Sequence, residues 1–305
     1  MTDAKGFETG SALTERSLPV KGRRIRYFVG GDGPPLVLVH GLGGSATNWI
    51  ELAPLLAPTF RLVIPDLPGH GASEPLPGVS GLQPYADRVA AVMEHEGAAP
   101  APVVGHSLGG LVVLRLALRR PRAVSAVVLA ASAGLSIGGV WGRNLLTAVT
   151  VIRPGRLAGR YRSIVARSPI LRRIVFGVVS VADPIGLSDV SVEGFLAGQV
   201  LHTDTGSAWR SLRDDDPRQE LEQLGRPVLV LWGSDDVQLP LDDAFEYARR
   251  LRAPLRVIAG CGHLLIGERP EPCADAIREF LVSVGSRRSA TVADAGTASG
   301  SVRGP

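Results

Sequence analysis

The chain has 305 residues, of which 45% are hydrophobic and 20% charged, and its formal net charge at pH 7 is +4. This composition is typical of a folded globular protein, and it excludes a wholly disordered chain, a collagen-like repeat and a disulfide scaffold. The two cysteines, Cys261 and Cys273, lack metal-ligand spacing, and so few cysteines predict a reducing, cytoplasmic compartment.

Short apolar runs alternate with longer amphipathic ones along the chain. Expected strands cover residues 24–29, 36–39, 61–64, 102–104, 124–129, 228–231 and 255–258, and expected helices cover residues 46–56, 85–95, 108–119, 241–251 and 272–284. Strands that alternate with helices indicate an α/β fold with a mostly parallel, doubly wound sheet covered on both faces.

The alternation stops between residues 134 and 224. This section predicts helices at residues 141–152, 160–164, 170–179 and 192–201. Because it stands between two expected strands, we predict a helical lid at residues 134–224, inserted into a core of residues 17–133 and 225–284.

The remaining segments are the two ends and one long uncharged run. Residues 1–16 lack the apolar core of a secretory signal and are expected to be flexible, and the small, polar residues 285–305 predict a disordered tail. Residues 123–142 carry no charge but are rich in Ala, Ser and Gly. They favour a buried strand that runs into a loop over a membrane span.

A G-x-S-x-G run, Gly105-His106-Ser107-Leu108-Gly109, stands between an expected strand and an expected helix. This context is typical of a nucleophile elbow, a strained turn that exposes the serine hydroxyl and is too tight for side chains on its flanks. The positive end of the following helix favours an oxygen that gains negative charge. Ser107 is therefore the candidate nucleophile, and the alternative is a tight turn with an unreactive serine.

The run His40-Gly41-Leu42-Gly43-Gly44-Ser45 follows an expected buried strand. Glycines let backbone amides approach a substrate closely, which an oxyanion hole requires, and we assign the N–H groups of Leu42 and Leu108 as its donors. A phosphate-binding loop is the alternative, but neither G-x-x-x-x-G-K-[ST] nor G-x-G-x-x-G occurs here.

A carboxylate and an imidazole follow two late strands. Asp235 and Asp236 come after residues 228–231, and His263 comes after residues 255–258. Open α/β sheets place their sites at the carboxyl ends of the strands, and the chain order Ser107, aspartate, His263 is that of an α/β-hydrolase triad. The residues alone do not separate Asp235 from Asp236.

The other histidines have separate expectations. His40 and His106 flank tight loops and should bond to the backbone, whereas His70 lies in a turn and His95 on a helix surface. His202 lies in the insertion and is a candidate substrate contact. No group of His, Cys and carboxylates has metal-ligand spacing, so neither a metal nor a cofactor is expected.

Five motifs occur in one order: HGLGGS, DLPGHGAS from Asp66 to Ser73, GHSLGG, WGSDDVQLP and GCGHLLIGERP. On these motifs the chain resembles, over residues 17–284, the α/β-hydrolase-fold superfamily and its lidded, serine carboxylesterase-like branch. The family's acid stands three residues after the glycine and four before the proline, so the resemblance selects Asp236. It also implies that the Asp66 loop is structural and packs beside the oxyanion loop. Family members that act on epoxides or haloalkanes have an aspartate nucleophile where this chain has Ser107, so those reactions are not expected.

The predicted function is that of a serine hydrolase that cleaves a carboxylic ester of a small or medium hydrophobic substrate through Ser107, Asp236 and His263. Two alternatives stay open. The same three residues could act on another bond, as a C–C hydrolase of a vinylogous diketone, a thioesterase, a cofactor-free haloperoxidase or a lyase. The non-enzymatic alternative is a lidded module that binds a ligand without turnover. Candidate substrate contacts in the lid are Trp141, Phe176, Phe195 and His202.

Charge is unevenly distributed along the chain. Residues 97–182 contain no Asp or Glu, whereas arginine recurs at positions 143, 153, 156, 160, 162, 167, 172 and 173. The stretch could be a solvated face, a site for an anionic substrate group, or a surface that contacts anionic lipid. Nucleic-acid binding is not expected, because no recognised module or aromatic platform accompanies the charge. The oligomeric state is left open.

Overall fold

The structure is a computed structural model that describes residues 13–133, 154–177, 181–215 and 217–298. Within these ranges, eight strands form one sheet in the order β1-β2-β4-β3-β5-β6-β7-β8. The first two, β1 (Thr14–Val20) and β2 (Arg23–Gly30), are antiparallel, and β2 also runs antiparallel to β4. The neighbouring pairs from β4 to β8 are all parallel. These strands are β3 (Pro35–Val39), β4 (Arg61–Pro65), β5 (Ala101–His106), β6 (Val124–Ala130), β7 (Val228–Gly233) and β8 (Leu255–Ile258).

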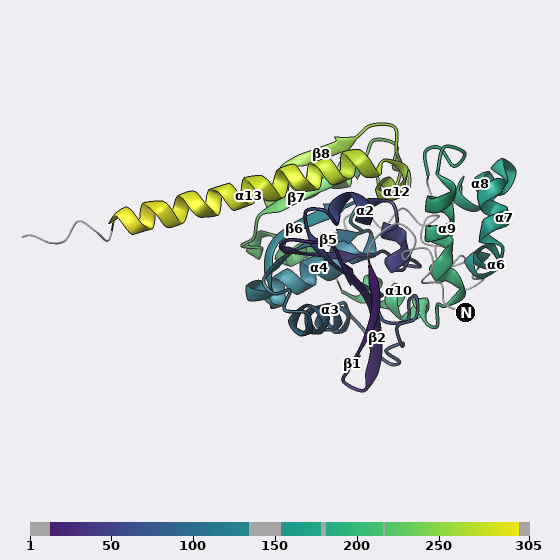
Figure 1. The fold of residues 1–305 in the computed structure, drawn as a ribbon, viewed down its shortest axis with the longest axis horizontal. Coiled ribbons are helices and arrows are strands. Elements are labelled where there is room, and N and C mark those ends of the chain that lie inside the picture. The colour runs from purple at the N-terminus through teal and green to yellow at the C-terminus, as the bar shows by residue number, and fades with distance from the viewer. Residues whose placement is uncertain (1–12, 134–153, 178–180, 216, 299–305) are drawn as a thin grey trace, which may run out of the picture.

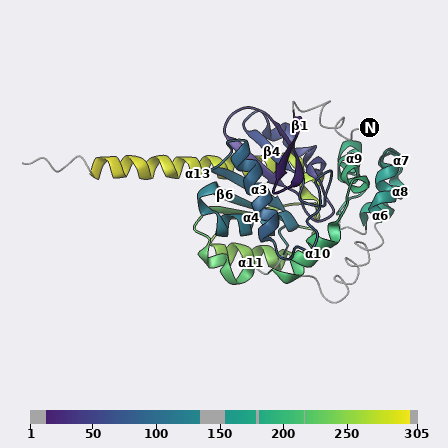
Figure 2. The ribbon, with the colours of Figure 1, turned by 90° about the horizontal axis from the view of Figure 1, so that it is seen from below.

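Helices cover both faces of the sheet. On one face α2 (Leu52–Leu56) packs against α13 (Pro270–Ala298), and on the other lie α3 (Gln83–His95), α4 (Leu108–Arg119) and α11 (Leu241–Leu251) (Figure 1 and Figure 2). This is the predicted doubly wound α/β architecture, with the hairpin of β1 and β2 added at one edge.

The central strands consist of apolar residues because both of their faces are covered. Every residue of β6 is buried, and in β3 the four residues from Leu36 to Val39 are fully buried. Parallel strands buried on two sides read as continuous apolar runs rather than alternating ones. Burying each such side chain stabilises the fold by about 1.5–3 kcal/mol. The uncharged run is therefore a core strand at residues 124–130, and its residues 134–142 lie outside the described part. Among the described residues, no helix is both long and apolar enough to cross a membrane.

The N-terminal boundary differs from the prediction. Residues 14–16, expected to be flexible, belong to β1, which pairs with β2 from Thr14↔Val29 to Val20↔Arg23. An edge strand with mostly exposed, charged residues lacks the apolar pattern that identifies core strands. The overlooked signal is the turn Lys21-Gly22, where both residues have positive φ, 49° and 75°, as a two-residue hairpin turn requires.

The described chain between β6 and β7 consists of helices joined by turns and loops, the longest of them at residues 181–188. It forms α6 (Pro154–Arg160), α7 (Arg162–Arg167), α8 (Pro169–Phe176), α9 (Asp189–Ala197), η4 (Gly198–Val200), α10 (Thr205–Asp214) and η5 (Pro217–Gln223). The helix expected at residues 141–152 lies outside the described residues. Helix α10 was not expected, although Asp204 caps its first turn by accepting a hydrogen bond from the N–H of Ser207 at 3.0 Å.

Two helices have other bounds than predicted. The helix expected at residues 46–56 is divided into η1 (Ala46–Trp49) and α2, because Pro54 has no N–H and is tolerated only in the first turn of α2. The tail expected to be disordered from residue 285 is helical to Ala298, as the outer end of α13. A small, polar composition removes the core contacts of a helix but not its main-chain hydrogen bonds, and Figure 1 shows that this end projects from the body.

Candidate active site

The G-x-S-x-G run forms the turn between β5 and α4. Ser107 has φ 54° and ψ −119°, a strained conformation for a residue that is not glycine. A Cβ on Gly105 would lie 2.4 Å from the carbonyl oxygen of Gly109, and one on Gly109 would lie 2.2 Å from that of Val39. The flanking glycines are therefore required by close packing, as the motif predicted. The Ser107 hydroxyl makes no hydrogen bond to any of the described residues.

Asp236 and His263 form a buried pair in the loops that follow β7 and β8. The Nδ1–H of His263 donates to Oδ2 of Asp236 at 2.9 Å. The other carboxylate oxygen accepts the N–H groups of Gln238 at 2.9 Å and Leu239 at 2.8 Å, which orient the carboxylate. Asp235 is exposed. The proton on Nδ1 leaves Nε2 of His263 as the basic atom.

His106 connects the His263 loop to the elbow. Its Nε2–H donates to the carbonyl oxygen of His263 at 2.8 Å, and the two ring centroids lie 5.0 Å apart. Because Ser107 follows His106 directly, this bond holds the His263 loop beside the elbow. Burial, and next the neighbouring His263, lower the pKa of His106 to about 3, so the ring is neutral. The expectation that His106 bonds to the backbone is confirmed.

The loop after β3 orients the N–H of Leu42. The N–H of Leu67 donates to Nε2 of His40 at 2.9 Å, so Nδ1 carries the proton and donates to the carbonyl oxygen of Gly41 at 2.8 Å. That oxygen also accepts the N–H of Gly44 at 3.1 Å. In a planar trans peptide the N–H of Leu42 is antiparallel to this carbonyl, so it points away from His40.

The N–H groups of Leu42 and Leu108, the predicted oxyanion donors, remain available to donate within the described part of the chain. No hydrogen bond joins the N–H of Leu42 or of Leu108 to another group in the described ranges. A Cβ on Gly41 would lie 2.8 Å from Cβ of Ser107, so the backbone that precedes Leu42 rests against the elbow. The loop that contains Leu42 therefore lies against the elbow, and Leu108 belongs to the elbow itself as the first residue of α4.

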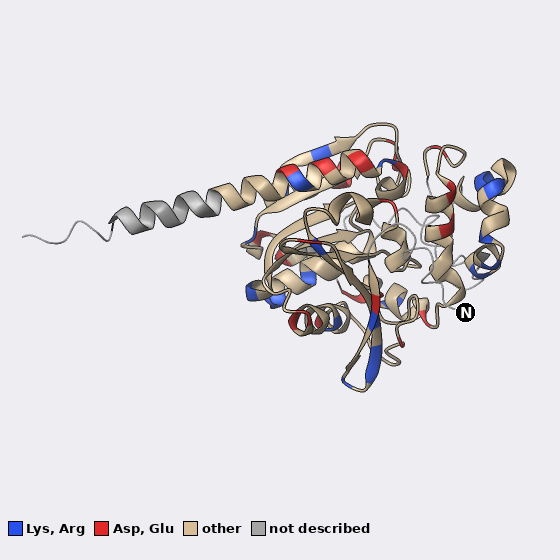
Figure 3. Ribbon diagram, in the orientation of Figure 1, with Lys and Arg blue, Asp and Glu red and all other residues tan. Residues whose placement is uncertain are grey.

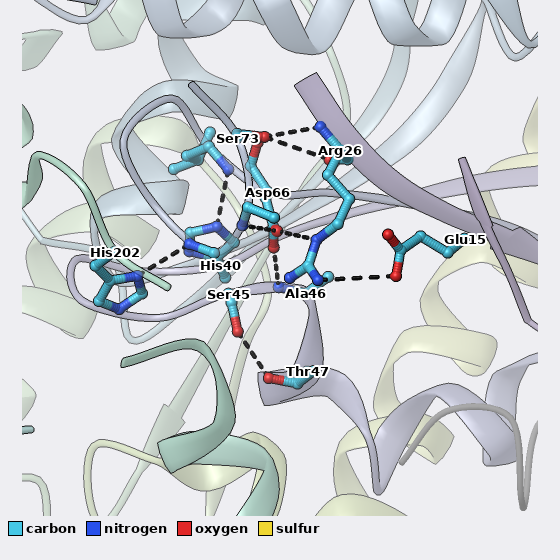
Figure 4. Close-up of polar contacts among 12 residues, drawn as sticks. Glu15, Arg26, His40, Ser45, Ala46, Thr47, Asp66, Ser73 and His202 are labelled. Carbon is cyan, nitrogen blue, oxygen red and sulfur yellow. Dashed lines mark hydrogen bonds and ion pairs between the residues drawn. The ribbon is translucent and has the colours of Figure 1, made fainter. Parts of the chain in front are cut away.

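The Asp66 loop packs beside this segment, as the resemblance implied. The buried Asp66 carboxylate accepts Nε–H of Arg26 at 2.6 Å and the N–H groups of Ala46 at 2.7 Å and Ala72 at 3.0 Å. Figure 4 shows Arg26, Ala46 and Ser73 around Asp66. One carboxylate therefore joins β2, the start of η1 and its own loop.

His202 contacts the loops rather than leaving its ring free for a substrate. Its Nδ1 accepts the N–H of Gly71 at 2.9 Å, and its Nε2–H donates to the carbonyl oxygen of Gly43 at 2.8 Å. The side-chain amide of Gln199 donates to the same oxygen. The predicted role in substrate contact has no support from this geometry, since both ring nitrogens are bonded to backbone groups.

Three buried imidazoles, those of His40, His70 and His202, stand in a row beside these loops. The ring of His70 stands between His40, at a centroid distance of 5.3 Å, and His202, at 5.4 Å. Its Nδ1 bonds to the carbonyl oxygen of Pro68 at 3.1 Å, and its buried Nε2 has no hydrogen-bond partner in the described chain. Burial lowers the pKa of His40, and it lowers that of His70 further. Burial therefore favours the neutral form of both rings.

Glu268 anchors the loop that precedes His263. Its carboxylate accepts the N–H of Gly262 at 3.0 Å and that of Ala182, in the insertion, at 2.9 Å. Burial raises its pKa. Sequence reasoning did not select Glu268, although it belongs to the GCGHLLIGERP motif.

The remaining lid candidates are partly described. Phe176 and Phe195 are buried and meet edge to face at 6.4 Å between centroids, and Phe195 packs on Gly267 of α12 (Leu265–Glu268). They join the insertion to the helix that follows His263. Trp141 lies outside the described residues.

The sheet, the elbow and the three loops at its carboxyl edge define an α/β-hydrolase fold. The sequence model of the Alpha/beta hydrolase family matches residues 36–276, and the chain belongs to this family. It is a hydrolase-fold enzyme.

Characterised relatives act on different bonds. The chain is 32% identical to the dihydrolipoyllysine-residue acetyltransferase component of the acetoin cleaving system of Pseudomonas putida, over 90% of this chain and 71% of that protein. It is 31% identical to the pyrrolizixenacetamide deacetylase of Xenorhabdus hominickii, over 85% and 95%. The crystal structure of an esterase from Rhodococcus sp. ECU1013 superposes with a TM-score of 0.71 at 27% identity, over 90% and 99%.

Proposed function

We propose that the chain is a serine hydrolase that cleaves carboxylic esters of small or medium hydrophobic substrates through an acyl-enzyme. The observation that carries this proposal is the hydrogen bond between His263 and Asp236 at 2.9 Å, in a loop bonded through His106 to the elbow of Ser107. A buried carboxylate that fixes the histidine tautomer is what a general base next to a serine requires.

In the proposed first step, Oγ of Ser107 attacks the carbonyl carbon while Nε2 of His263 takes its proton. Asp236 stabilises the imidazolium that forms. The N–H groups of Leu42 and Leu108 bind the oxyanion, and each contributes about 3–4 kcal/mol to lowering the barrier, by analogy with measured oxyanion donors. The hydrogen bond from Ser107 to His263, absent here, forms when substrate binds, because such bonds tighten in the Michaelis complex.

The intermediate then collapses and the bond to the leaving alcohol breaks. His263 gives its proton to the alkoxide, and the alcohol leaves an ester of Ser107. Water attacks this ester, His263 takes a proton from the water, and Ser107 regains a proton as the carboxylic acid departs. The strain at Ser107 keeps its hydroxyl at the tip of the turn in both steps.

The esterase at 27% identity favours an ester as the bond that is cleaved. The deacetylase at 31% identity favours an amide as the second candidate. Both reactions use the same acyl transfer, so the distinction depends on the leaving group and on the pocket rather than on Ser107.

Purified protein assayed with p-nitrophenyl esters of graded acyl length, p-nitroacetanilide and a vinylogous diketone tests the proposal. We expect turnover of esters at the highest kcat/KM. Faster cleavage of the anilide or of the diketone would reject the ester assignment and retain the serine mechanism.

Two adjacent aspartates allow a matched test of which carboxylate orients His263. Asp236→Asn should lower kcat about 10⁴-fold, because an amide at this position stabilises the wrong histidine tautomer. Asp235→Asn changes an exposed carboxylate and should leave kcat unchanged. Equal effects of the two substitutions would show that Asp236 is not the orienting acid.

A further inference from the structure

Helices α6, α7 and α8 form the outer layer of the insertion. Both α6 and α7 pack against α9, and α8 packs against α7. Figure 1 and Figure 2 agree in placing the three helices beyond α9, on the side away from the sheet. One side of this layer is thus covered by the protein, and the other faces outward.

The outward side carries large apolar residues. Ile170 and Leu157 are 72% and 67% exposed, and Ile174, Ile164 and Tyr161 are 61%, 58% and 49% exposed. Leu157 lies on α6, Ile164 lies on α7, and Tyr161 stands at the junction between these two helices. Ile170 and Ile174 are four residues apart on α8, so they share one face of that helix. Single exposed apolar residues are ordinary, but four on three consecutive short helices, with a fifth at a junction between two of them, are typical of an interaction surface.

Arginines accompany these residues. Arg156, Arg160, Arg167 and Arg173 are exposed and make no ion pair with any residue in the described ranges. Figure 3 shows blue without red on α6 to α8, and red on the neighbouring α9. By contrast, Arg172 is buried and donates to the carbonyl oxygen of Ile185 at 2.9 Å and to Asp189, so its role is structural.

We propose that the outer face of α6–α8, defined by Leu157, Tyr161, Ile164, Ile170, Ile174 and the four exposed arginines, docks on an anionic lipid surface. Apolar side chains that enter the acyl boundary next to arginines that meet anionic headgroups are the two components of interfacial binding.

Three other uses of this face fit less well. A merely solvated face explains the arginines but not the isoleucines. A site for an anionic substrate group would lie near Ser107, whereas α9 separates this layer from the core. A second copy of the same face would bring four unpaired arginines against four more, which like-charge repulsion disfavours.

Vesicle co-sedimentation of the full chain tests the proposal. The two vesicle types are phosphatidylcholine alone and phosphatidylcholine with about one third phosphatidylglycerol. We expect binding to the second type only, weakened by high salt because the arginine attraction is screened. Absent binding, or equal binding to both types, would overturn the proposal.

Substitutions on α6–α8 test whether this face is the part of the protein that contacts the vesicle. Ile170→Asp with Ile174→Asp, and separately Arg156→Gln, Arg160→Gln, Arg167→Gln and Arg173→Gln together, should each weaken vesicle binding about tenfold or more. Phe245→Asp changes an apolar residue that is 55% exposed on α11 and should bind as the parent does.

Thermal unfolding establishes that each variant is folded, and sedimentation velocity reports the oligomeric state. Vesicle binding that persists in the folded α6–α8 variants would overturn the proposal. So would a dimer that the isoleucine substitutions dissociate without a change in lipid binding. The readout does not use catalysis, so failure of the ester assignment leaves this test intact.

Discussion

The Nε2–H of His202 donates to the carbonyl oxygen of Gly43 at 2.8 Å, across 159 positions of the chain. Because Nδ1 of the same ring accepts the N–H of Gly71, one imidazole joins the insertion, the Asp66 loop and the loop that contains Leu42. His202 is therefore a positioning residue for the proposed oxyanion hole.

Removing this imidazole should slow the reaction more than it weakens binding. We expect His202→Ala to lower kcat about tenfold or more with little change in KM, because a misplaced oxyanion donor is lost mainly in the transition state. His202→Gln keeps an N–H near Gly43 and should recover part of the rate. Steady-state kinetics on one ester checks this. Equal losses in the two variants, or a change in KM alone, would contradict the positioning role.

Gly41 separates the oxyanion loop from the elbow. In Gly41→Ala the new Cβ would lie 2.8 Å from Cβ of Ser107 and 3.2 Å from the carbonyl oxygen of His106, so one of the two loops must move. A displacement near 1 Å costs about a hundredfold in rate. Gly177→Ala is the matched control, because its Cβ meets nothing within 4 Å. An unchanged kcat/KM in the Gly41 variant would refute the close packing.

Asp66 is predicted to act on stability. Asp66→Asn breaks the buried pair with Arg26 and leaves the guanidinium with only the exposed Glu15 carboxylate, 3.8 Å away, which should cost about 3 kcal/mol of the free energy of unfolding. The exposed Asp32→Asn should stay within about 0.5 kcal/mol of the parent. Urea unfolding measures both. A loss as small as that of the control would show that the Asp66 network contributes little.

The buried histidines predict how stability depends on pH. The pKa of His106 is about 3 in the folded chain and about 6.5 when unfolded, so below about pH 6.5 the unfolded state binds a proton that the folded state does not. Stability is therefore full above that pH and falls as the pH drops toward 3, by up to about 1.4 kcal/mol per pH unit. The lowered pKa values of His40 and His70 act in the same direction.

Urea unfolding at several pH values measures this slope. His106→Gln should reduce the slope below about pH 6.5 by close to one proton, since glutamine does not titrate. A slope that is the same in the parent and in the His106 variant would contradict a neutral, buried His106.

The core and the candidate site were predictable where the pattern is local. Continuous apolar runs predicted β3 and β6, because both faces of a central parallel strand are covered. Spacing within one turn predicted the elbow of Ser107, because close packing requires its two glycines. The family pattern, not the residues alone, separated Asp236 from Asp235.

Two kinds of feature could not be predicted: contacts between residues that are distant in the sequence, and segments at the periphery of the fold. No local pattern shows that His202 meets Gly43, or that Glu268 meets Gly262 and Ala182, because the fold alone brings these groups together. Strand β1 is exposed and charged, and the sequence at the outer end of α13 is small and polar, so composition favoured flexibility or disorder for both segments.

The nucleophile is the central claim, and labelling with a fluorophosphonate probe followed by peptide mass mapping tests it most directly. We predict one covalent adduct per folded chain, on Ser107, with labelling and ester hydrolysis both lost in Ser107→Ala and labelling strongly slowed in His263→Gln. A folded protein that stays unlabelled at Ser107, or a Ser107→Ala variant that hydrolyses esters at the parental rate, would contradict the account.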